Sequence, residues 1–501
     1  MVDIYKLRGC IKMGELKTND LKTSQLKRGL KARHLNMIAI GGAIGTGLFL
    51  ASGGTVSQAG PGGALIAYTV IGIMVYFLMT SLGEMATFMP VTGSFETYAS
   101  RFVDPALGFA LGWNYWYNWA ITVAVEMVAG AMIMKYWFPN VPAIIWSISF
   151  LIILFGLNML SAKAYGESEF WFASIKVVAV IVFLAVGVAM IFGIIGGHYV
   201  GLSNFTFLDP KSGAKGPFPF GFKGILMVFL IAGFSFQGTE LVGIAAGESE
   251  DPEKNIPKAI KSVFWRIIIF YLGAIFIISA LIPFTEAGVT TSSFTTIFER
   301  AGIAGAASLM NAVVLTSVLS CANSGMYAAS RMLFAMAREG RAPKAFSNVN
   351  SKGVPVNALL ITTLVASASF LIGLYAQETV YMWLVAASGL AGFIAWVGIA
   401  LCHYRFRKAF IAQGKDLNKL KYKAKFFPFG PILALILCVI VILGQGVTYF
   451  TADQIDWKNI IASYIGLPLF IALWIGYKVK YKTKIVNLKE ASFSTEPIHD
   501  K

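Results

Sequence analysis

Twelve long apolar stretches run through the chain and constrain its fold more than any other feature. A helix needs about 20 apolar residues to cross the hydrocarbon core of a bilayer. Because that core cannot hydrogen-bond open backbone groups, spanning segments must be helices or a closed barrel. These runs are continuous rather than alternating, which excludes a barrel. The sequence therefore predicts an all-α membrane protein with twelve transmembrane helices, at approximately 36–53, 62–88, 106–134, 142–160, 169–193, 222–246, 262–283, 302–337, 355–375, 379–403, 431–450 and 459–478.

The distribution of charge orients these helices. Only 13% of the 501 residues are charged, against about 25% in soluble domains. If both termini are cytoplasmic, 33 of the 41 Lys and Arg residues fall in inner segments and six in outer loops, as the positive-inside rule requires. The net charge of +16 is thereby explained without a nucleic-acid partner, and it favours contact with anionic lipid of the bilayer.

The predicted organisation has three parts. Residues 1–33 form a cytoplasmic N-terminal tail, residues 34–479 the twelve-helix domain, and residues 480–501 a cytoplasmic C-terminal tail. Both tails are polar, and we expect them to be mobile.

Two of the apolar stretches contain clusters of glycine and polar residues, at 41–47 and at 233–240. Glycine costs about 1 kcal/mol in a helix interior, so these segments are expected to unwind. One cluster alone is better explained by close helix packing through small residues. Two clusters, in the first and sixth helices of a five-plus-five inverted repeat followed by helices 11 and 12, are typical of a transporter site near the bilayer midplane.

The chemistry of a broken helix suggests a ligand with two opposite charges. Free N–H groups at the start of the second half favour an anion, and free carbonyl groups at the end of the first half favour a cation. An α-amino acid carries both charges on neighbouring atoms. We expect Gly45, Thr46 and Gly47 to bind its carboxylate, and carbonyl groups near Phe234 and Ser235 to accept hydrogen bonds from its ammonium group.

The third apolar stretch places an aromatic face beside a carboxylate. Tyr115, Trp119, Thr122 and Glu126 follow i, i+4, i+7, i+11 spacing and therefore share one face of a helix. The alternative is an aromatic belt at the headgroup level of the membrane, which suits the neighbouring tryptophans better than Tyr115 and Trp119.

Ionisable residues within spans are expensive and usually functional. Glu240 follows the second glycine cluster and is the expected partner of a cationic substrate, while Glu126 either shares that role or is a packing carboxylate. Lys176 either exchanges a proton when desolvated or extends to the cytoplasmic surface. Glu84, near an inner helix end, is expected to be structural. Because no cage of several oxygen ligands for sodium is evident, proton coupling is favoured over sodium coupling.

Other functional classes find no support in the sequence. The four His and four Cys residues are scattered, without the spacing of a metal site or of a nucleophilic catalytic group. We therefore expect no enzymatic activity, no catalytic residue, no cofactor and no metal.

Four motifs give the chain a family resemblance. They are HLNMIAIGGAIGTGLF at 34–49, SLGEMATFMPVTGSF at 81–95, GWNYWYNWA at 112–120 and FSFQGTELVGIAAGESEDPEKNIPKAI at 234–260. Over about residues 28–478 the chain resembles the amino acid–polyamine–organocation transporters, specifically the bacterial amino acid permeases, and among these it is most similar to the lysine-specific members.

The resemblance implies the helix-bundle fold shared with sodium-coupled leucine transporters, and uptake of L-lysine or another basic amino acid by proton symport across the bacterial inner membrane. It also implies that the substrate binds at 45–47 and around Phe234, and that Lys176 couples transport to protons. Lysine-specific members often have aspartate where this chain has Glu126. Two alternatives remain: an amino acid exchanger, and a lysine-binding sensor that acts through a regulatory membrane partner.

Overall fold

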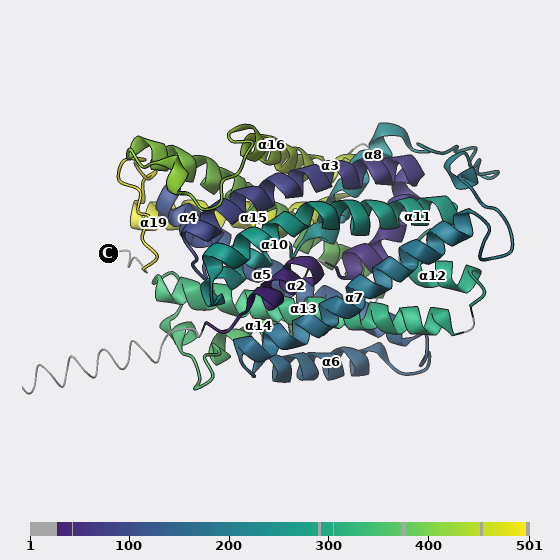
Figure 1. The fold of residues 1–501 in the computed structure, drawn as a ribbon, viewed down its shortest axis with the longest axis horizontal. Coiled ribbons are helices and arrows are strands. Elements are labelled where there is room, and N and C mark those ends of the chain that lie inside the picture. The colour runs from purple at the N-terminus through teal and green to yellow at the C-terminus, as the bar shows by residue number, and fades with distance from the viewer. Residues whose placement is uncertain are drawn as a thin grey trace, which may run out of the picture.

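The computed structural model describes residues 28–42, 44–288, 292–303, 305–371, 377–450 and 454–496. Within these ranges the chain is helical and forms no named strand; its only β-type pairings are two isolated bridges, Leu30 with Ser249 and Leu208 with Lys215. The longer helices run roughly along the long axis of the molecule (Figure 1). The predicted all-α class is confirmed.

Helix occurs in every one of the twelve predicted apolar stretches. Among the residues that the structure describes, seven helices are long and apolar enough to cross a membrane, or eight if the bent pair α18–α19 is one span; α6, α14 and α16 are shorter apolar helices. The main elements are α2 (Ala32–Gly41), η1 (Gly47–Ala51), α3 (Ser52–Phe88), α4 (Phe95–Phe102), α5 (Pro105–Met134), α6 (Ala143–Asn158), α7 (Ala162–Ile191), α8 (Gly221–Phe236), α9 (Leu241–Ala245), α10 (Pro252–Arg266), η4 (Ile267–Leu272), α11 (Gly273–Leu281), α12 (Ser293–Arg300), α13 (Ala306–Arg338), α14 (Val356–Leu371), α15 (Gln377–Ala412), α16 (Phe429–Gly444), α17 (Val447–Phe450), α18 (Trp457–Tyr464) and α19 (Gly466–Tyr481).

Both predicted helix interruptions are present. α2 ends at Gly41, and the chain becomes helical again with the π-helical η1 at Gly47, which leads into α3. α8 ends at Phe236; Gln237 is extended, with ψ 147°, and Gly238 has φ 94°. A positive φ of this size is readily adopted by glycine alone, so Gly238 allows the chain to turn into α9.

The junction of the first two predicted stretches lies inside α3. Gly60 has φ 74° and ψ 173°, and Pro61 follows it. A Cβ atom at Gly60 would lie 2.1 Å from Cδ of Pro219, so neither the backbone conformation nor the space there admits a larger residue. Residues 52–59 therefore continue the first predicted helix, and residues 61–88 form the second.

Two short helices that the apolar pattern did not predict, α4 and α12, pack against the central helices. In α4, Phe95 packs edge-on against Tyr115 with ring centroids 4.7 Å apart. Just before α12, Ser292 donates a hydrogen bond to the carbonyl oxygen of Phe49 at 2.7 Å, and Phe294 packs against the Phe49 ring at 4.6 Å. The segment at α12 thus packs on the resumed part of the first helix, and α4 packs on α5 beside the site.

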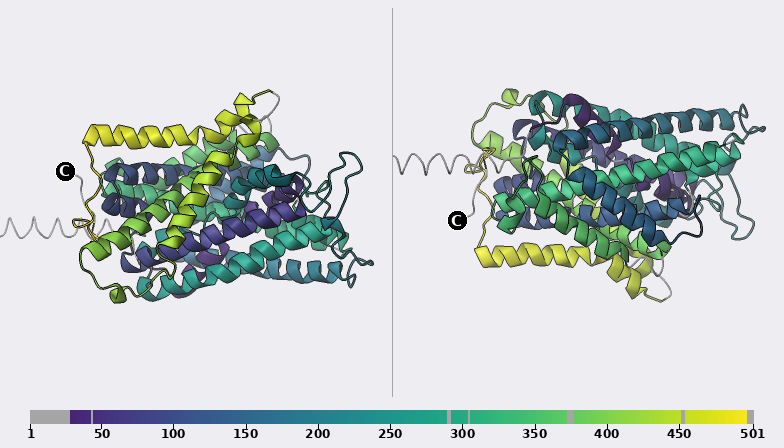
Figure 2. Two further views of the ribbon diagram at one scale, coloured as in Figure 1. Left: turned by 90° about the horizontal axis from the view of Figure 1, so that it is seen from above. Right: turned by 90° about the horizontal axis from the view of Figure 1, so that it is seen from below.

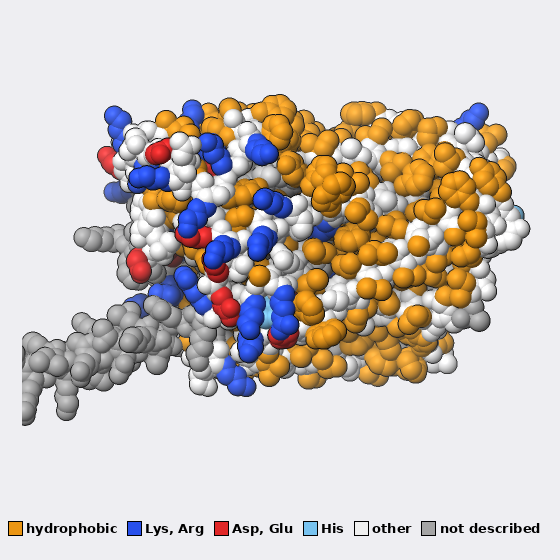
Figure 3. All heavy atoms as spheres, in the orientation of Figure 1, with side chains coloured by type: hydrophobic (Ala, Val, Ile, Leu, Met, Phe, Trp, Pro, Cys, Tyr) orange, Lys and Arg blue, Asp and Glu red, His pale blue; other side chains and the backbone are white. Residues whose placement is uncertain are grey.

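Charged side chains gather at one end of the molecule. Figure 3 shows Lys and Arg concentrated over the left end of this face and hydrophobic side chains over the remainder. The last described segment of the chain lies at that same end, whereas α19 runs along the outside of the bundle in both views of Figure 2. This asymmetry is what the positive-inside rule predicts for a cytoplasmic end.

The C-terminal segment is packed against this charged end. Gln413 donates hydrogen bonds from Nε2 to the carbonyl oxygens of Leu488 and Ala491, at 3.1 and 2.8 Å. The ring of Phe493 lies 5.6 Å from that of Phe406, in a larger aromatic cluster. The expectation of a mobile tail is wrong for this segment, because apolar residues within the polar tail find a hydrophobic surface on the bundle.

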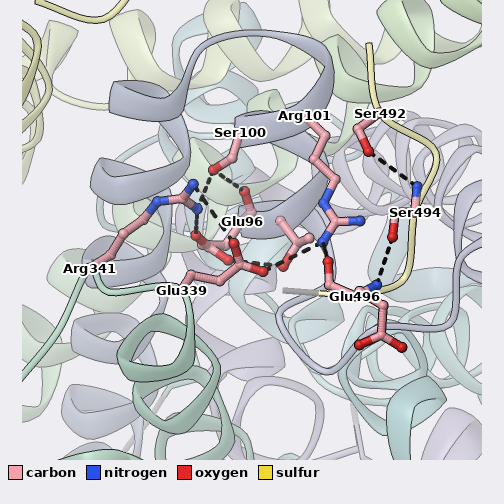
Figure 4. A network of polar contacts seen from close by, with 9 residues as sticks. Glu96, Ser100, Arg101, Glu339, Arg341, Ser492, Ser494 and Glu496 are labelled. Atoms are coloured by element: carbon pink, nitrogen blue, oxygen red, sulfur yellow. Dashed lines mark hydrogen bonds and ion pairs between the residues drawn. The ribbon is translucent and has the colours of Figure 1, made fainter. Parts of the chain in front are cut away.

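A second set of contacts holds the charged end together, as Figure 4 shows. Nη1 of Arg341 lies 2.5 Å from both Oε1 of Glu96 and Oγ of Ser100. Arg101 donates from Nη2 to the carbonyl oxygen of Glu496 at 2.7 Å and lies 3.5 Å from Glu339. These contacts join α4, the segment after α13 and the C-terminal segment.

The buried carboxylate of Glu84 has the structural role that the sequence predicted. It forms a two-point ion pair with Arg407 of α15 and accepts a hydrogen bond from the backbone N–H of Ala424 at 2.7 Å. Both charged side chains are buried, Glu84 completely and Arg407 to 5% exposure.

We expect Glu84→Gln to lower the free energy of unfolding by about 3–5 kcal/mol, because it leaves the Arg407 charge buried without its anion. The matched control is Glu253→Gln, which removes an exposed ion pair with Lys421 and should cost less than about 1 kcal/mol. Denaturant unfolding of both variants in detergent measures the difference, and equal losses would contradict the structural role of Glu84.

Candidate functional site

The two interrupted helices touch each other at their breaks. A Cβ atom at Gly47 would lie 2.4 Å from Cα of Ser235, and one at Gly42 would lie 3.1 Å from Leu241. Only the absence of a side chain at Gly47 allows the backbones of η1 and α8 to approach this closely. The resulting contact brings backbone N–H and carbonyl groups of both breaks to one place.

A small cavity lies at this contact. Its volume is ≈ 10 Å³, and it is lined by Gly45, Gly47, Trp119, Thr122, Glu126, Phe234, Gln237 and Cys321. That is about the space of one water molecule. A ligand as large as an amino acid therefore requires the surrounding helices to move apart.

Glu126 of α5 reaches the break in the first helix. Thr46 donates a hydrogen bond from its hydroxyl to Oε1 of Glu126 at 3.0 Å. Glu126 is 1% exposed, and its other oxygen, Oε2, has no hydrogen-bond partner among the described residues. A buried, unbonded carboxylate oxygen beside a cavity has a strong tendency to bind a cation or a donor.

Glu240 lies at the second break, and both of its carboxylate oxygens are bonded. Backbone N–H of Gly238 lies 3.2 Å from each oxygen. Tyr115 donates from its hydroxyl to Oε1 at 3.2 Å, and Trp396 of α15 donates from Nε1 to Oε2 at 3.3 Å. Buried Arg266 also interacts electrostatically with this carboxylate. Glu240 thus stabilises the turn at Gly238.

A polar network that the sequence did not reveal supports the second break. Gln237 donates from Nε2 to the carbonyl oxygens of Ser388 and Gly389, at 3.1 and 3.3 Å. The Ser388 hydroxyl bonds to Oδ1 of Asn118 at 2.9 Å and to the Thr122 hydroxyl at 2.7 Å. Ser388 lies in α15, about 270 residues from α5, and a lone serine in an apolar helix carries no sequence signal of this contact.

Lys176 lies behind the first break. Its Nζ donates to the carbonyl oxygen of Gly41 at 2.7 Å, and its side chain is 0% exposed. The alternative in which Lys176 extends to the cytoplasmic surface is therefore wrong. Sequence reasoning missed its acidic neighbour Glu169, whose Oε1 lies 3.8 Å from Nζ. The seven-residue spacing of Glu169 and Lys176 was the available signal.

The structure brings the predicted site residues together around the two breaks. Gly45, Gly47, Trp119, Glu126 and Phe234 line the cavity. The other predicted binding residues lie close by. Thr46 hydrogen-bonds to Glu126, and Tyr115 hydrogen-bonds to Glu240, which itself accepts from the turn at Gly238. The Ser235 hydroxyl lies 2.8 Å from that of Tyr68. Their roles in binding remain predictions.

Comparison with known proteins places this arrangement in a family. The family model "Amino acid permease" matches residues 34–490. The chain belongs to the amino acid permease family. It is 54% identical over 484 residues to the lysine-specific permease LysP of Escherichia coli (strain K12), covering 95% of this chain and 97% of that relative.

Two further relatives come from Lactococcus lactis subsp. cremoris (strain MG1363). The chain is 54% identical to its lysine-specific permease LysP over 491 residues, which are 96% of this chain and 95% of the relative. It is 49% identical to its histidine permease HisP over 478 residues, which are 94% and 98% of the two chains. Together with the long apolar helices, membership of this family makes the chain a multi-pass membrane transporter and not an enzyme.

The close contact of the two breaks generates a test. We expect Gly47→Ala to reduce amino acid uptake by about tenfold or more, because its Cβ would overlap the backbone of Ser235 and overpacking costs about 1–3 kcal/mol. Gly156→Ala is the matched control, since a Cβ there meets no atom within 4 Å. Uptake into proteoliposomes, normalised to folded protein, measures both variants. Uptake by Gly47→Ala at the control's rate would contradict this account.

Proposed function

We propose that the chain is a secondary active transporter that imports L-lysine, or a closely related basic amino acid, by proton symport. The observation that carries the proposal is the pair of buried carboxylates at the two breaks, Glu126 at the first and Glu240 at the second. Two acids at the adjoining breaks, one of them lining the cavity, suit a substrate with an additional positive charge. The high identity to lysine-specific permeases supports lysine as that substrate.

The substrate's groups have a physical match in the site. Its carboxylate would meet the N–H groups at 45–47, and its α-ammonium group the carbonyl groups that end α8. Its side-chain ammonium would meet Oε2 of Glu126, which the protein leaves unbonded. Glu240, whose oxygens are already bonded, would act chiefly through its charge.

Transport would proceed by alternating access to this site between helices 1, 3, 6 and 8 of a twelve-helix, five-plus-five repeat. The contacts of α4 on one side and of α12 on the other would open in turn. Lys176 would couple these movements to protons, because it bonds the backbone at the end of α2. Both termini would be cytoplasmic, in keeping with the basic end of the molecule.

Lysine uptake into proteoliposomes under an imposed pH gradient tests the proposal. We expect a gradient that is acid outside to drive labelled lysine inward above its equilibrium level, because a proton would enter with each substrate. A competition panel of lysine, arginine, ornithine and histidine defines the substrate range.

Other outcomes identify the alternatives. Uptake that is independent of the gradient but requires internal substrate would establish an exchanger. Binding of lysine without transport would favour a sensor that acts through a partner protein.

The proposed pairing of Glu126 and Glu240 with the substrate's positive charge has its own test. We expect Glu126→Gln to weaken lysine binding by about tenfold or more, because hydrogen bonds to charged groups contribute about 1.5–3 kcal/mol. Binding of norleucine, which has the same length without the side-chain ammonium, should change much less. Glu240→Gln should also weaken the cationic ligand more than the neutral one. Ligand-induced thermal stabilisation measures all four pairs, and equal losses for both ligands would refute the assignment.

A further inference from the structure

A buried acid and a buried base face each other on α7. Glu169 and Lys176 are both 0% exposed, and Oε1 of Glu169 lies 3.8 Å from Nζ of Lys176. Residues seven apart lie almost two turns apart on one face of a helix. Glu169 is the nearer of the two to the basic, N-terminal end of α7. Neither residue lines the cavity, so substrate contact does not explain the pair.

The pair lies against the end of α2, one residue before the broken segment. A Cβ atom at Gly41 would lie 2.2 Å from Cβ of Ala173 and 3.6 Å from Oε1 of Glu169. The missing side chain at Gly41 thus lets α2 approach both charges. Because Lys176 bonds the Gly41 carbonyl at 2.7 Å, a change in its protonation acts directly on the backbone that ends α2.

A polar stripe continues from Glu169 toward the basic end of the molecule. Ser320 of α13 donates to the carboxylate of Glu169, with its hydroxyl 2.8 and 2.7 Å from the two oxygens. Further along the same helix, Ser324 accepts from the Tyr165 hydroxyl at 3.0 Å, and Tyr327 donates to Glu248 at 2.8 Å.

The stripe ends at Glu248. Arg331 donates to this carboxylate from Nε at 3.0 Å, and the N–H groups of Gly29 and Leu30 bond the Glu248 carbonyl at 3.1 Å each. Positions 320, 324, 327 and 331 follow the spacing of one helix face. Apart from Glu248 and the Gly29–Leu30 segment, the residues of the pair and the stripe lie on α2, α7 and α13. Figure 1 labels these three helices near one another.

The remaining charged or titratable groups near the pair are few. α5 contributes Glu126, and α13 contributes Cys321, Tyr327 and Arg331. α2 contributes His34 and Arg33, at its far end beside Gly166 and Glu167. α6 and α11 contain no ionisable residue, and α12 carries Glu299 and Arg300 at its C-terminal end. Glu169 is therefore the carboxylate that ion-pairs with Lys176.

We propose that Glu169 is the proton acceptor of Lys176 and passes the proton to the cytoplasm; this inference rests on the proton symport proposed above. An N–H bond of the Lys176 ammonium breaks and leaves its electron pair on Nζ. Once the 3.8 Å separation of the two groups closes to hydrogen-bond range, a lone pair of the Glu169 carboxylate forms the new O–H bond, so both groups become neutral. When the basic end opens, water along the stripe takes the proton from Glu169. Lys176 regains a proton from the outside in the next cycle.

Substitution at Glu169 tests the inference in proteoliposomes. Glu169→Gln should slow lysine accumulation driven by a pH gradient by about a hundredfold or more, the lower end of the losses when an acid–base group is removed. Exchange of internal for external lysine needs no net proton release, so it should persist. Glu169→Asp keeps a carboxyl group and should retain part of the accumulation. Glu167→Gln, at a partly exposed position on the same helix, is the matched control and should behave as the unmodified protein.

The outcomes separate this inference from the proposal on which it rests. If the unmodified protein shows no gradient-driven accumulation, proton symport itself fails and Glu169 has no such role. If the unmodified protein accumulates lysine and Glu169→Gln does so equally, symport stands and the inference is overturned. Equal loss of exchange and accumulation in Glu169→Gln would show a structural ion pair. If that variant does not fold, Glu169→Asp decides by the same comparison of exchange with accumulation.

Discussion

The structure depends on how a membrane protein satisfies backbone groups that are freed inside the bilayer. Every unpaired N–H or carbonyl group in the hydrocarbon core costs several kcal/mol, and this chain opens two helices there. The first break is held by Ser317, which donates to the carbonyl oxygen of Ile44 at 2.8 Å, and by Lys176 on Gly41. The second is held by Glu240 and Gln237. Several other helices therefore have to surround the two broken ones.

Five of the buried carboxylates divide into two kinds by their partners. Glu84, Glu96 and Glu248 are each paired with an arginine, at Arg407, Arg341 and Arg331 respectively. These pairs lie toward the basic end and join helices or hold loops against them. Glu126 and Glu240, in contrast, are hydrogen-bonded by neutral groups. Under the proposed function, these two carboxylates would meet the cationic groups of the substrate.

Much of the fold followed from the sequence because its physical causes are local. A run of apolar residues long enough for a bilayer predicts a helix whatever its neighbours are, and clustered glycines predict a break. The polar face of α5 was likewise readable, since helical spacing alone aligns Trp119, Thr122 and Glu126. Short helices such as α4 and α12 escaped prediction, because their packing over the site, rather than their own composition, accounts for their position.

The sequence by itself determined the helical class, the places where two helices open, the basic end and most residues beside the cavity. Only the tertiary structure decided which partner each polar residue meets. In the folded chain Ser388 hydrogen-bonds to Gln237, Glu169 forms an ion pair with Lys176, and Phe493 packs on an aromatic surface. The physical reason is the distance along the chain over which each effect acts. Helix formation and bilayer burial depend on residues within a few turns. Hydrogen bonds and ion pairs between helices depend instead on which of many similar apolar surfaces pack together.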